Sequence, residues 1–254
     1  MKVPAATLAR VFWRCLFLQA AWNRRGMQNL GFAYAIDPAL RRLYADPERR
    51  KEALRRHLCF FNCHPYTGAA IVGGAIHHEE RVAAGEEAER LPLVFKETLQ
   101  GPLAAIGDGF FWTALRPFFG ALMAFGALAF GWPAVVAGLV LYNAVHMALR
   151  IRLFLAGYRR GDAVVSEVAR LSLPVVADRL RLGAAALAGL CLVLVLAKGA
   201  AAMTLPLALA GLAAAALGAL ALWLGLRLFP AVYATILAGA GATLAAVHLF
   251  LRGP

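Results

Sequence analysis

Long stretches without charged residues dominate the second half of the chain. Residues 117–149 contain no Asp, Glu, Lys or Arg, and further uncharged runs occupy residues 182–197, 199–226 and 228–251. A helix rises 1.5 Å per residue, so it needs about 20 residues to cross the ~30 Å hydrocarbon core of a bilayer. The first run therefore predicts a tilted membrane span plus a re-entrant piece. The later three predict two or three further crossings.

The run 182–197 is short for a span by itself. It must recruit residues 171–180, which places Asp178 and Arg179 at the membrane interface or in a pair inside the protein, because charges are costly in hydrocarbon. Segments rich in Gly and Ala, such as residues 210–226, favour close contact between helices. The C-terminal part thus predicts a transmembrane bundle.

The N-terminal part predicts amphipathic helices. Between residues 7 and 16 the polar and apolar positions separate onto two faces at helical spacing: Thr7, Arg10 and Arg14 on one, Leu8, Val11, Phe12, Cys15 and Leu16 on the other. This pattern fits a helix in the membrane interface, or equally one packed inside a larger assembly. A second helix is expected to begin at Asp46, Pro47 and Glu48, which supply an N-cap acceptor, a proline at the first position and an early acid.

Composition indicates an integral membrane protein. Hydrophobic residues make up 61% of the 254 residues and charged residues 16%, with mean hydropathy +0.67. Soluble domains carry about 25% charged residues, so the chain has too little polar surface for an ordinary globule. The apolar content excludes disorder, and the length with only four cysteines excludes a disulfide-stapled secreted module.

Positive charge is concentrated at the N-terminus. Residues 1–58 contain 12 of the 26 Lys and Arg and 4 of the 14 Asp and Glu, so they carry +8 of the net +12. The positive-inside rule predicts this segment and the cluster Arg150, Arg152, Arg159 and Arg160 on the cytoplasmic side. No cleavable signal peptide is expected, because Arg14 interrupts the apolar stretch 11–22, which also lacks a small-residue cleavage site.

The middle of the chain, residues 59–116, combines polar groups with residues that interrupt helices. Inside a bilayer the backbone can leave a helix only where protein or a water-filled cavity satisfies its amides. We therefore expect broken or re-entrant helices around a site, at the positions Pro65, Gly73, Gly74, Gly101, Pro102, Gly107 and Gly109. Transporters build substrate sites in this way.

The polar residues within these breaks are the candidate substrate ligands. Asn62, His64 and Asp108 offer hydrogen bonds to sugar hydroxyls, and Phe111 and Trp112 offer flat apolar faces for C–H groups. Glu80 and Trp112 are weaker candidates.

Three further residues have supporting roles in this prediction. Arg116 is predicted to balance the Asp108 charge, Pro65 to end the preceding helix, and Gly107 to break the chain. The alternative is structural: Asn62 and His64 cap a helix, and Asp108 simply pairs with Arg116.

At these residues the chain resembles the IID membrane component of the mannose/fructose/sorbose branch of the bacterial phosphoenolpyruvate-dependent sugar phosphotransferase system. The resemblance covers most of the chain. Its strongest part is the heptapeptide 60–66, FFNCHPY. The other matching residues are Arg14, Gln19, Asn23, Met27, Gln28, Gly31, Phe32, Tyr34, Pro38, Leu43, Tyr44, Glu79, Glu80, Gly101 to Ala104, Ile106 to Asp108, Phe111, Trp112 and Leu115 to Pro117.

The resemblance implies a permease subunit rather than a catalyst. In that family IID pairs with a IIC membrane subunit, the pairs form a trimer of heterodimers, and sugar of the hexose class binds within the complex. Cytoplasmic IIA and IIB proteins carry the phosphoryl group, so none of the six histidines here needs to be a phosphocarrier. The implied location is the bacterial cytoplasmic (inner) membrane, with several crossings and no cofactor.

From the residue patterns and the family resemblance together, we predict an all-α polytopic membrane protein in three segments. Residues 1–58 form a basic amphipathic segment on the cytoplasmic side, residues 59–165 a core transport segment with broken helices, and residues 166–254 the C-terminal transmembrane helices.

Three other functions are compatible with parts of the sequence. A membrane metalloenzyme would use His57, Cys59, Cys63 and His64, but their spacing fits no standard zinc pattern, and the adjacent His77 and His78 diverge by about 100° on a helix. We therefore expect no metal. The basic N-terminal segment could bind lipid headgroups or nucleic acid, although basic flanks usually set topology, so no nucleic-acid partner is expected.

The third alternative is a IID relative retained for regulation. Cys63 replaces the family's usual Thr, Gly109 replaces its Ser, and the C-terminal half is short for the family.

Overall fold

The computed structural model describes residues 2–200, with side chains up to residue 195. Over these residues the chain is helical and forms no strand, only isolated bridges from Met27 to Asn23 and to Phe61. The all-α prediction is confirmed for this part. The helices are α1 (Ala5–Cys15), α2 (Asn29–Leu43), α3 (Pro47–His57), α4 (Gly68–Ala83), α5 (Leu91–Gly107), η1 (Asp108–Leu115), α6 (Arg116–Phe130), α7 (Trp132–Arg160), η2 (Gly161–Ala163), α8 (Val164–Arg170) and α9 (Leu173–Ala200).

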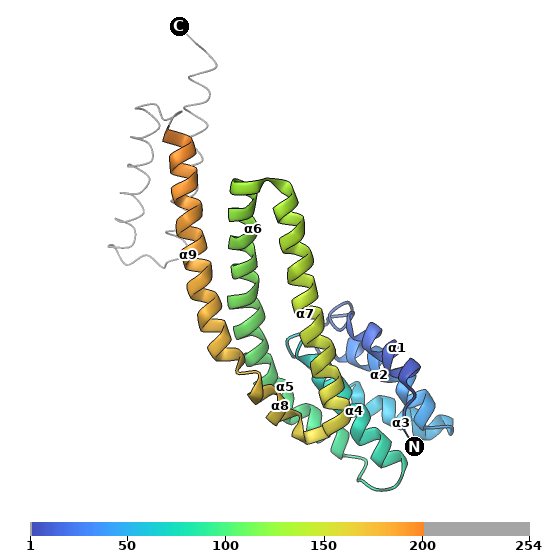
Figure 1. The fold of residues 1–254 in the computed structure, drawn as a ribbon. Helices are drawn as coiled ribbons and strands as arrows, with labels where there is room; N and C mark the ends of the chain where they lie inside the picture. Colours follow the sequence, from blue (N-terminus) through green and yellow to red (C-terminus); the bar gives the residue numbers. More distant parts are fainter. Residues whose placement is uncertain (1, 201–254) are drawn as a thin grey trace. The chain divides into compact units, whose positions relative to one another are not determined.

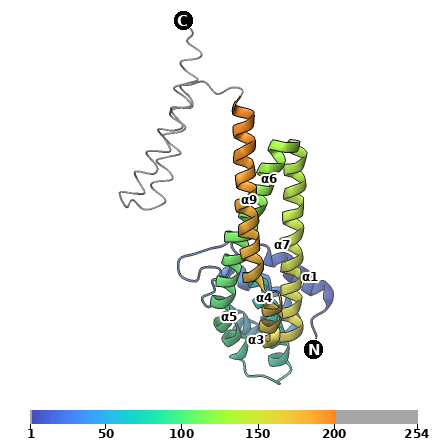
Figure 2. The ribbon, with the colours of Figure 1, turned by 60° about the vertical axis from the view of Figure 1, so that its left-hand side comes forward.

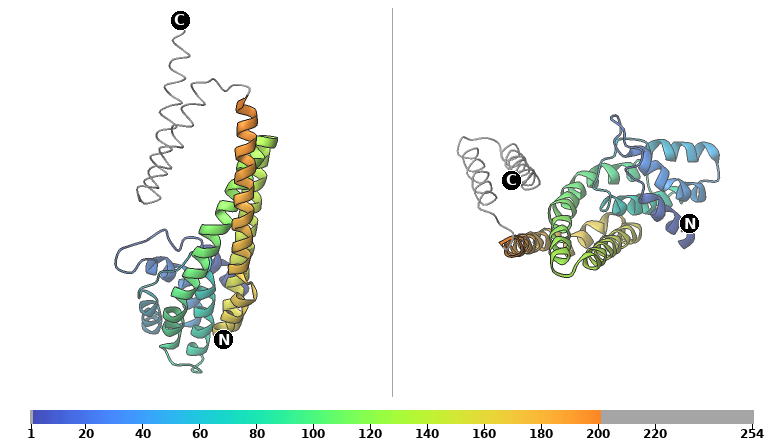
Figure 3. Two further views of the ribbon diagram at one scale, coloured as in Figure 1. Left: turned by 90° about the vertical axis from the view of Figure 1, so that its left-hand side faces the viewer. Right: turned by 90° about the horizontal axis from the view of Figure 1, so that it is seen from above.

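The chain divides into two compact units, Met1–Cys191 and Leu192–Pro254. Within the first unit, helices α1 to α5 and the C-terminal half of α7 form one cluster in which α4 contacts α1, α2, α5 and α7 (Figure 1). Helix α6 and the N-terminal half of α7 form a hairpin that extends away from this cluster, as the turned views in Figures 2 and 3 also show. The predicted spans 199–226 and 228–251 lie almost entirely outside the described residues.

The uncharged run 117–149 forms this hairpin of two helical arms, and its division into a tilted span and a re-entrant piece stays a prediction. The turn is at Gly131, whose φ of 81° and ψ of −167° suit only glycine, and which separates α6 from α7. Two more glycines bring the arms together: a Cβ on Gly126 would lie 2.8 Å from that of Ala134, and one on Gly138 would lie 2.5 Å from Met123.

The predicted helix breaks at Gly73 and Gly74 were wrong. Both lie inside the uninterrupted helix α4, which packs against α7. A Cβ on Gly73 would overlap the carbonyl oxygen of Phe154, and a Cβ on Gly157 would overlap that of Ala70. These glycines therefore let two backbones approach closely, as small residues do between membrane helices.

The helix break predicted at Gly101 and Pro102 is also absent, because both residues lie within the continuous helix α5. An irregular stretch of helix does occur, but it begins after these residues and is a π-helix rather than a break. From Asp108 to Leu115 the helix widens into a π-helix and then continues as α6. π-Helical stretches are rare and are frequent at functional sites.

The N-terminal helices follow their sequence patterns. Helix α3 begins where predicted, and the side chain of Asp46 accepts a hydrogen bond from the backbone N–H of Arg49 at 3.1 Å. Helix α1 buries Val11 and Cys15 completely, so its apolar face packs in the protein core. Of the two interpretations of this helix, the structure favours the packed one for that face.

Two stretches, 91–130 and 132–195, contain helices long and apolar enough to cross a membrane. Both include helices of the hairpin. Asp178, predicted to lie at an interface or in a pair, forms an exposed ion pair with Arg181 at 2.6 Å.

Candidate functional site

The loop between α3 and α4 meets the π-helix at His64. The His64 side chain is 2% exposed, and its ring stacks on Phe111 with 4.9 Å between centroids and 12° between planes. Trp112 and Tyr66 approach the same ring edge-on, each at 5.0 Å. Gly107 makes room, because a Cβ there would overlap the Cβ of His64. The structure therefore brings the two predicted polar–aromatic segments together. We call the rings of Tyr66, Phe111 and Trp112 around His64 the aromatic box.

The hydrogen bonds of His64 define its proton position. Its Nδ1 accepts from the backbone N–H of Tyr66 at 3.2 Å, so the proton of the neutral ring is on Nε2. That Nε2 is buried and has no partner among the described residues. Burial, together with the charges of Arg150 and Arg116, lowers the pKa of His64 to about 3. His64 is a neutral donor at physiological pH.

Asn62 and Asp108 are exposed polar residues on the two segments that form this box. The backbone N–H of Asn62 donates to Oε1 of Gln100 at 3.0 Å. Neither side chain has a hydrogen bond or ion pair with another described residue. Their side chains therefore remain available to a ligand, which argues against the purely structural alternative for Asn62.

The predicted charge partnership between Asp108 and Arg116 was wrong. The Arg116 guanidinium lies over the Trp112 ring, 3.8 Å from its centroid, and no ion pair joins it to Asp108. Residues four apart on a helix face each other, whereas residues eight apart are about two turns removed. Arg116 therefore stabilises the position of Trp112 through a cation–π contact.

Glu80 is not part of the box. It lies 12 positions into α4, which at 1.5 Å per residue is about 18 Å from the start of that helix. Its Oε1 accepts from Tyr158 Oη at 2.7 Å and from the backbone N–H of Val3 at 2.6 Å. Glu80 thus ties the N-terminus and α7 to α4.

A second layer behind Tyr66 was not predicted. His146 stacks on the Tyr66 ring at 4.5 Å and 9°, and the Arg150 guanidinium lies 5.5 Å from its centroid. Nδ1 of His146 and Nε of Arg150 are buried and have no partner among the described residues. Arg150 is the first charged residue after the long uncharged run. That position could have marked it as a site residue, but we used it only to predict membrane topology.

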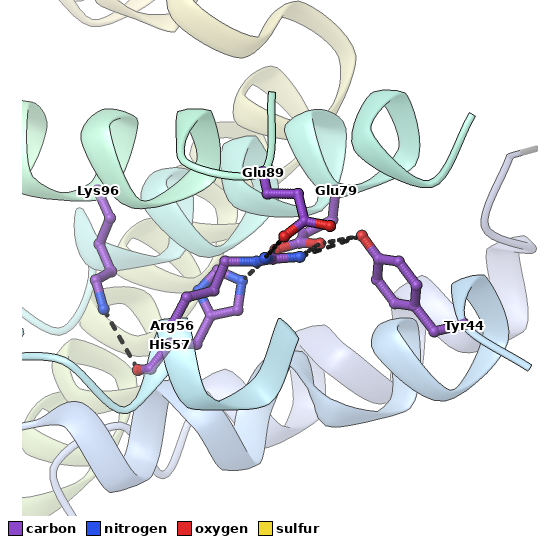
Figure 4. A network of polar contacts seen from close by, with 6 residues as sticks. All are labelled: Tyr44, Arg56, His57, Glu79, Glu89 and Lys96. Carbon is purple, nitrogen blue, oxygen red and sulfur yellow. Dashed lines mark hydrogen bonds and ion pairs between the residues drawn. The ribbon is translucent and has the colours of Figure 1, made fainter. Parts of the chain in front are cut away.

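A buried carboxylate network was also missed. Glu79 is fully buried, and its two oxygens accept from Arg56, His57 and Tyr44 (Figure 4). The distances are 2.8 Å from both Arg56 Nε and His57 Nε2 to Oε1, and 2.6 Å from Tyr44 Oη to Oε2. A second bond from Arg56 reaches Oε2 at 3.2 Å. The carboxylate therefore has about as many donors as it can accept.

The titration of this network follows from its contacts. Burial alone would raise the pKa of Glu79, but the hydrogen bonds from His57 and Arg56 and the charge of Arg56 outweigh it and lower the pKa to about 2. Burial lowers the pKa of His57, so the ring is neutral and donates from Nε2. The adjacent Lys96 is also fully buried and donates to the carbonyl oxygens of His57 and Cys59 at 3.3 and 3.2 Å.

The residues weighed for a metal site serve other contacts. His57 binds Glu79, His64 lies in the aromatic box, and Cys59 is exposed. In the described part of the chain, no three His, Cys, Asp or Glu side chains are grouped to hold an ion.

These features define the class: a helical membrane protein whose glycine-packed body places a neutral histidine in an aromatic box beside unpaired polar groups. Comparison with known proteins identifies the family. The model of the PTS system mannose/fructose/sorbose family IID component matches residues 2–210. The chain belongs to this family.

Several characterised relatives are similar. The mannose-specific EIID component of Escherichia coli K12 is 38% identical over 169 residues, which cover 66% of this chain and 60% of that protein. The sorbose-specific EIID component of Lacticaseibacillus casei is 35% identical over 168 residues, 66% of this chain and 60% of that protein. The fructose permease IID component of Bacillus subtilis is 32% identical over 160 residues, with 63% and 58% covered. The chain thus matches about three fifths of each relative.

Two solved structures share the fold. One is the cryo-EM structure of the mannose transporter ManYZ in complex with microcin E492, with 35% identity and a TM-score of 0.61 over 74% of this chain and 69% of the matched chain. The other is described as the structure of a membrane protein, with 36% identity and a TM-score of 0.66 over 72% and 68%.

Proposed function

We propose that this chain is the IID permease subunit of a mannose-family sugar phosphotransferase system. It forms the pathway for a sugar of the hexose class together with a IIC membrane subunit, as a trimer of IIC–IID heterodimers. IIB phosphorylates the sugar during entry and receives the phosphoryl group from IIA. The IID chain crosses the bacterial cytoplasmic membrane several times and carries no phosphoryl group itself. Family membership and the relatives named for mannose, sorbose and fructose support this proposal.

The proposed substrate-facing residues are Asn62, His64, Asp108 and Trp112. The observation that carries this assignment is the junction of the 60–66 loop with the π-helix, where His64 presents a buried N–H without a partner. Neutral donors, amide groups and a carboxylate recognise hydroxyls, while an indole face contacts sugar C–H groups. Pro65 and Gly107 shape the junction, and Glu80 holds α4 to α7 rather than joining the site.

The direct test is sugar uptake by Asn62→Ala in cells that express the partner subunits. Losing one hydrogen-bonding partner of a bound polar ligand costs about 1–3 kcal/mol, or roughly ten- to a hundredfold in affinity. We expect most uptake to be lost while the IIC–IID complex still copurifies. Ser166→Ala is the control, because Ser166 is exposed on α8 and its hydroxyl donates to the Ala163 carbonyl oxygen of the adjacent turn.

Two outcomes would count against this site. Normal uptake by Asn62→Ala would remove Asn62 from the substrate pathway. Loss of the complex in that variant, but not in Ser166→Ala, would show that Asn62 has a structural role.

A further inference from the structure

Two neighbouring grooves flank the C-terminal half of α7. The α7–α8 groove has a volume of about 510 Å³ and is bordered by α7 and by Glu167 of α8. The α1–α7 groove has a volume of about 370 Å³ and is bordered by Leu8 and Phe12 of α1 and by α7. Apart from their charged rims, the walls of both grooves are largely aliphatic or aromatic.

One ridge of α7 separates the two grooves. Ile151, Leu155 and Arg159 border both of them. These residues are four apart, so they form one stripe along the helix, about 12 Å long at 1.5 Å per residue. The stripe is apolar over its first two positions and ends in a guanidinium.

The charged end of the ridge has an excess of positive charge. Glu167 pairs with Arg152 at 2.6 Å and with Arg160 at 3.2 Å, which holds both guanidinium groups beside the α7–α8 groove. Arg159 is exposed and forms no ion pair with any residue in the described part. Three guanidinium groups therefore face one carboxylate, and Arg159 is available to an external anion.

The apolar end of the ridge continues into an exposed, apolar part of the hairpin. Leu139, Val140 and Leu141 of α7 are 52, 63 and 52% exposed. Guanidinium groups at the end of such a helix lie at the headgroup layer of the cytoplasmic leaflet, which is rich in anionic lipid. The ridge thus runs from hydrocarbon to headgroup depth.

We propose that an anionic phospholipid straddles this ridge, with one acyl chain in each groove and its phosphate on Arg159. A two-chain amphiphile matches two apolar grooves that converge on one unpaired cation. Arg152 and Arg160, oriented by Glu167, add long-range attraction to the headgroup. The proposal depends on the membrane location of the chain but not on sugar transport, so either can fail without the other.

The first test measures lipid binding to the full-length chain, purified in detergent with any membrane subunit that copurifies. Native mass spectrometry would follow titration with phosphatidylglycerol and, separately, with phosphatidylcholine. Each basic residue near the membrane surface contributes roughly a fivefold attraction to anionic lipid. We expect Arg159→Gln to weaken phosphatidylglycerol binding about fivefold and to leave phosphatidylcholine binding unchanged.

The matched control is Arg55→Gln, which removes the same charge from an exposed position on α3. Equal phosphatidylglycerol binding by the two variants would overturn the proposal, since any effect would then come from net charge. Millimolar inorganic phosphate should displace little of the lipid, because it lacks the acyl chains. Full displacement would show that the site binds phosphate alone and would also overturn it.

A second test locates the acyl chains. A bimane label on Ile151→Cys, with the accessible Cys59 and Cys191 changed to serine, should be quenched by phosphatidylglycerol carrying a doxyl group on its acyl chain. The same label on Arg55→Cys should not be quenched. Absence of quenching at Ile151, or its efficient cross-linking to a second protein subunit instead, would show that protein rather than lipid occupies the ridge.

Discussion

Two buried polar regions of this protein differ in how their charges are satisfied. Around Glu79, a buried anion accepts from two basic side chains and a tyrosine, and both oxygens are fully used. Around Tyr66, a buried cation, Arg150, has no carboxylate partner among the described residues, and three nitrogens on His64, His146 and Arg150 have no hydrogen bond to the described chain. The only comparable atom in the first region is Nδ1 of His57.

The difference separates a structural role from a binding role. A saturated buried ion pair couples the elements that supply its members, and removing one member leaves an uncompensated charge. Polar groups that the protein leaves unpaired do not stabilise the fold, because their desolvation is not repaid. Their retention beside the 60–66 loop is instead consistent with the proposed substrate site.

The largest expected effect is on stability, from Glu79→Ala. This variant leaves Arg56 partly buried without its main partner, and breaking such a pair costs about 3–5 kcal/mol. Thermal unfolding of the detergent-purified chain should show a large loss. Glu52→Ala, an exposed position on α3 without an ion pair to a described residue, should stay within about 0.5 kcal/mol of the parent. Similar stability in both variants would remove the distinction between the two regions.

The next effect is a loss of stability in acid. The pKa of Glu79 in the folded chain is about 2, below its ordinary value of 4.5, so the ionised carboxylate stabilises the fold above pH 4.5. That contribution, about 3 kcal/mol, disappears as the pH falls from 4.5 towards 2. Unfolding midpoints measured down this range should fall less steeply in Glu79→Gln than in the parent. Parallel curves would contradict the assignment.

The smallest stability effect is expected at His64, together with a large functional one. His64→Phe preserves the stack on Phe111 and removes both the unpaired Nε2 and the Nδ1 that accepts from the Tyr66 backbone N–H, so stability should fall by about 1 kcal/mol while sugar uptake is lost. His57→Phe makes the same chemical change at a paired histidine. It should cost about 1.5–3 kcal/mol, because Glu79 loses a donor. A greater loss of stability at His64 than at His57 would reverse the comparison.

Local patterns predicted the local structure well. The Asp46–Pro47–Glu48 start of α3 and the two faces of α1 depend on neighbouring residues only, and both are found. The polar–aromatic segments around His64 and Trp112 were selected because both were unusual in apolar sequence. The structure brings them together.

Tertiary contacts could not be predicted in the same way. Gly73 reads as a helix break in isolation, and only the backbone of α7 lying against it reveals a packing role. Glu79 and Glu80 are adjacent in sequence, but a rotation of about 100° on α4 gives them different partners, Arg56 for one and Tyr158 for the other. Long-range placement of α3 and α7 decides such roles.

The π-helix makes chain length matter more than residue identity over residues 108–115. Its i→i+5 hydrogen bonds accommodate more backbone per turn than an α-helix, which sets the rotational phase between α5 and α6. Deleting a single position, even the exposed Thr113, would turn α6 against α5, by less than the roughly 100° per residue of an α-helix because a π-helix has more residues per turn. Phe119 and Gly126 would then leave their buried positions. Relatives should therefore vary here by substitution, and insertions or deletions should be excluded from this stretch.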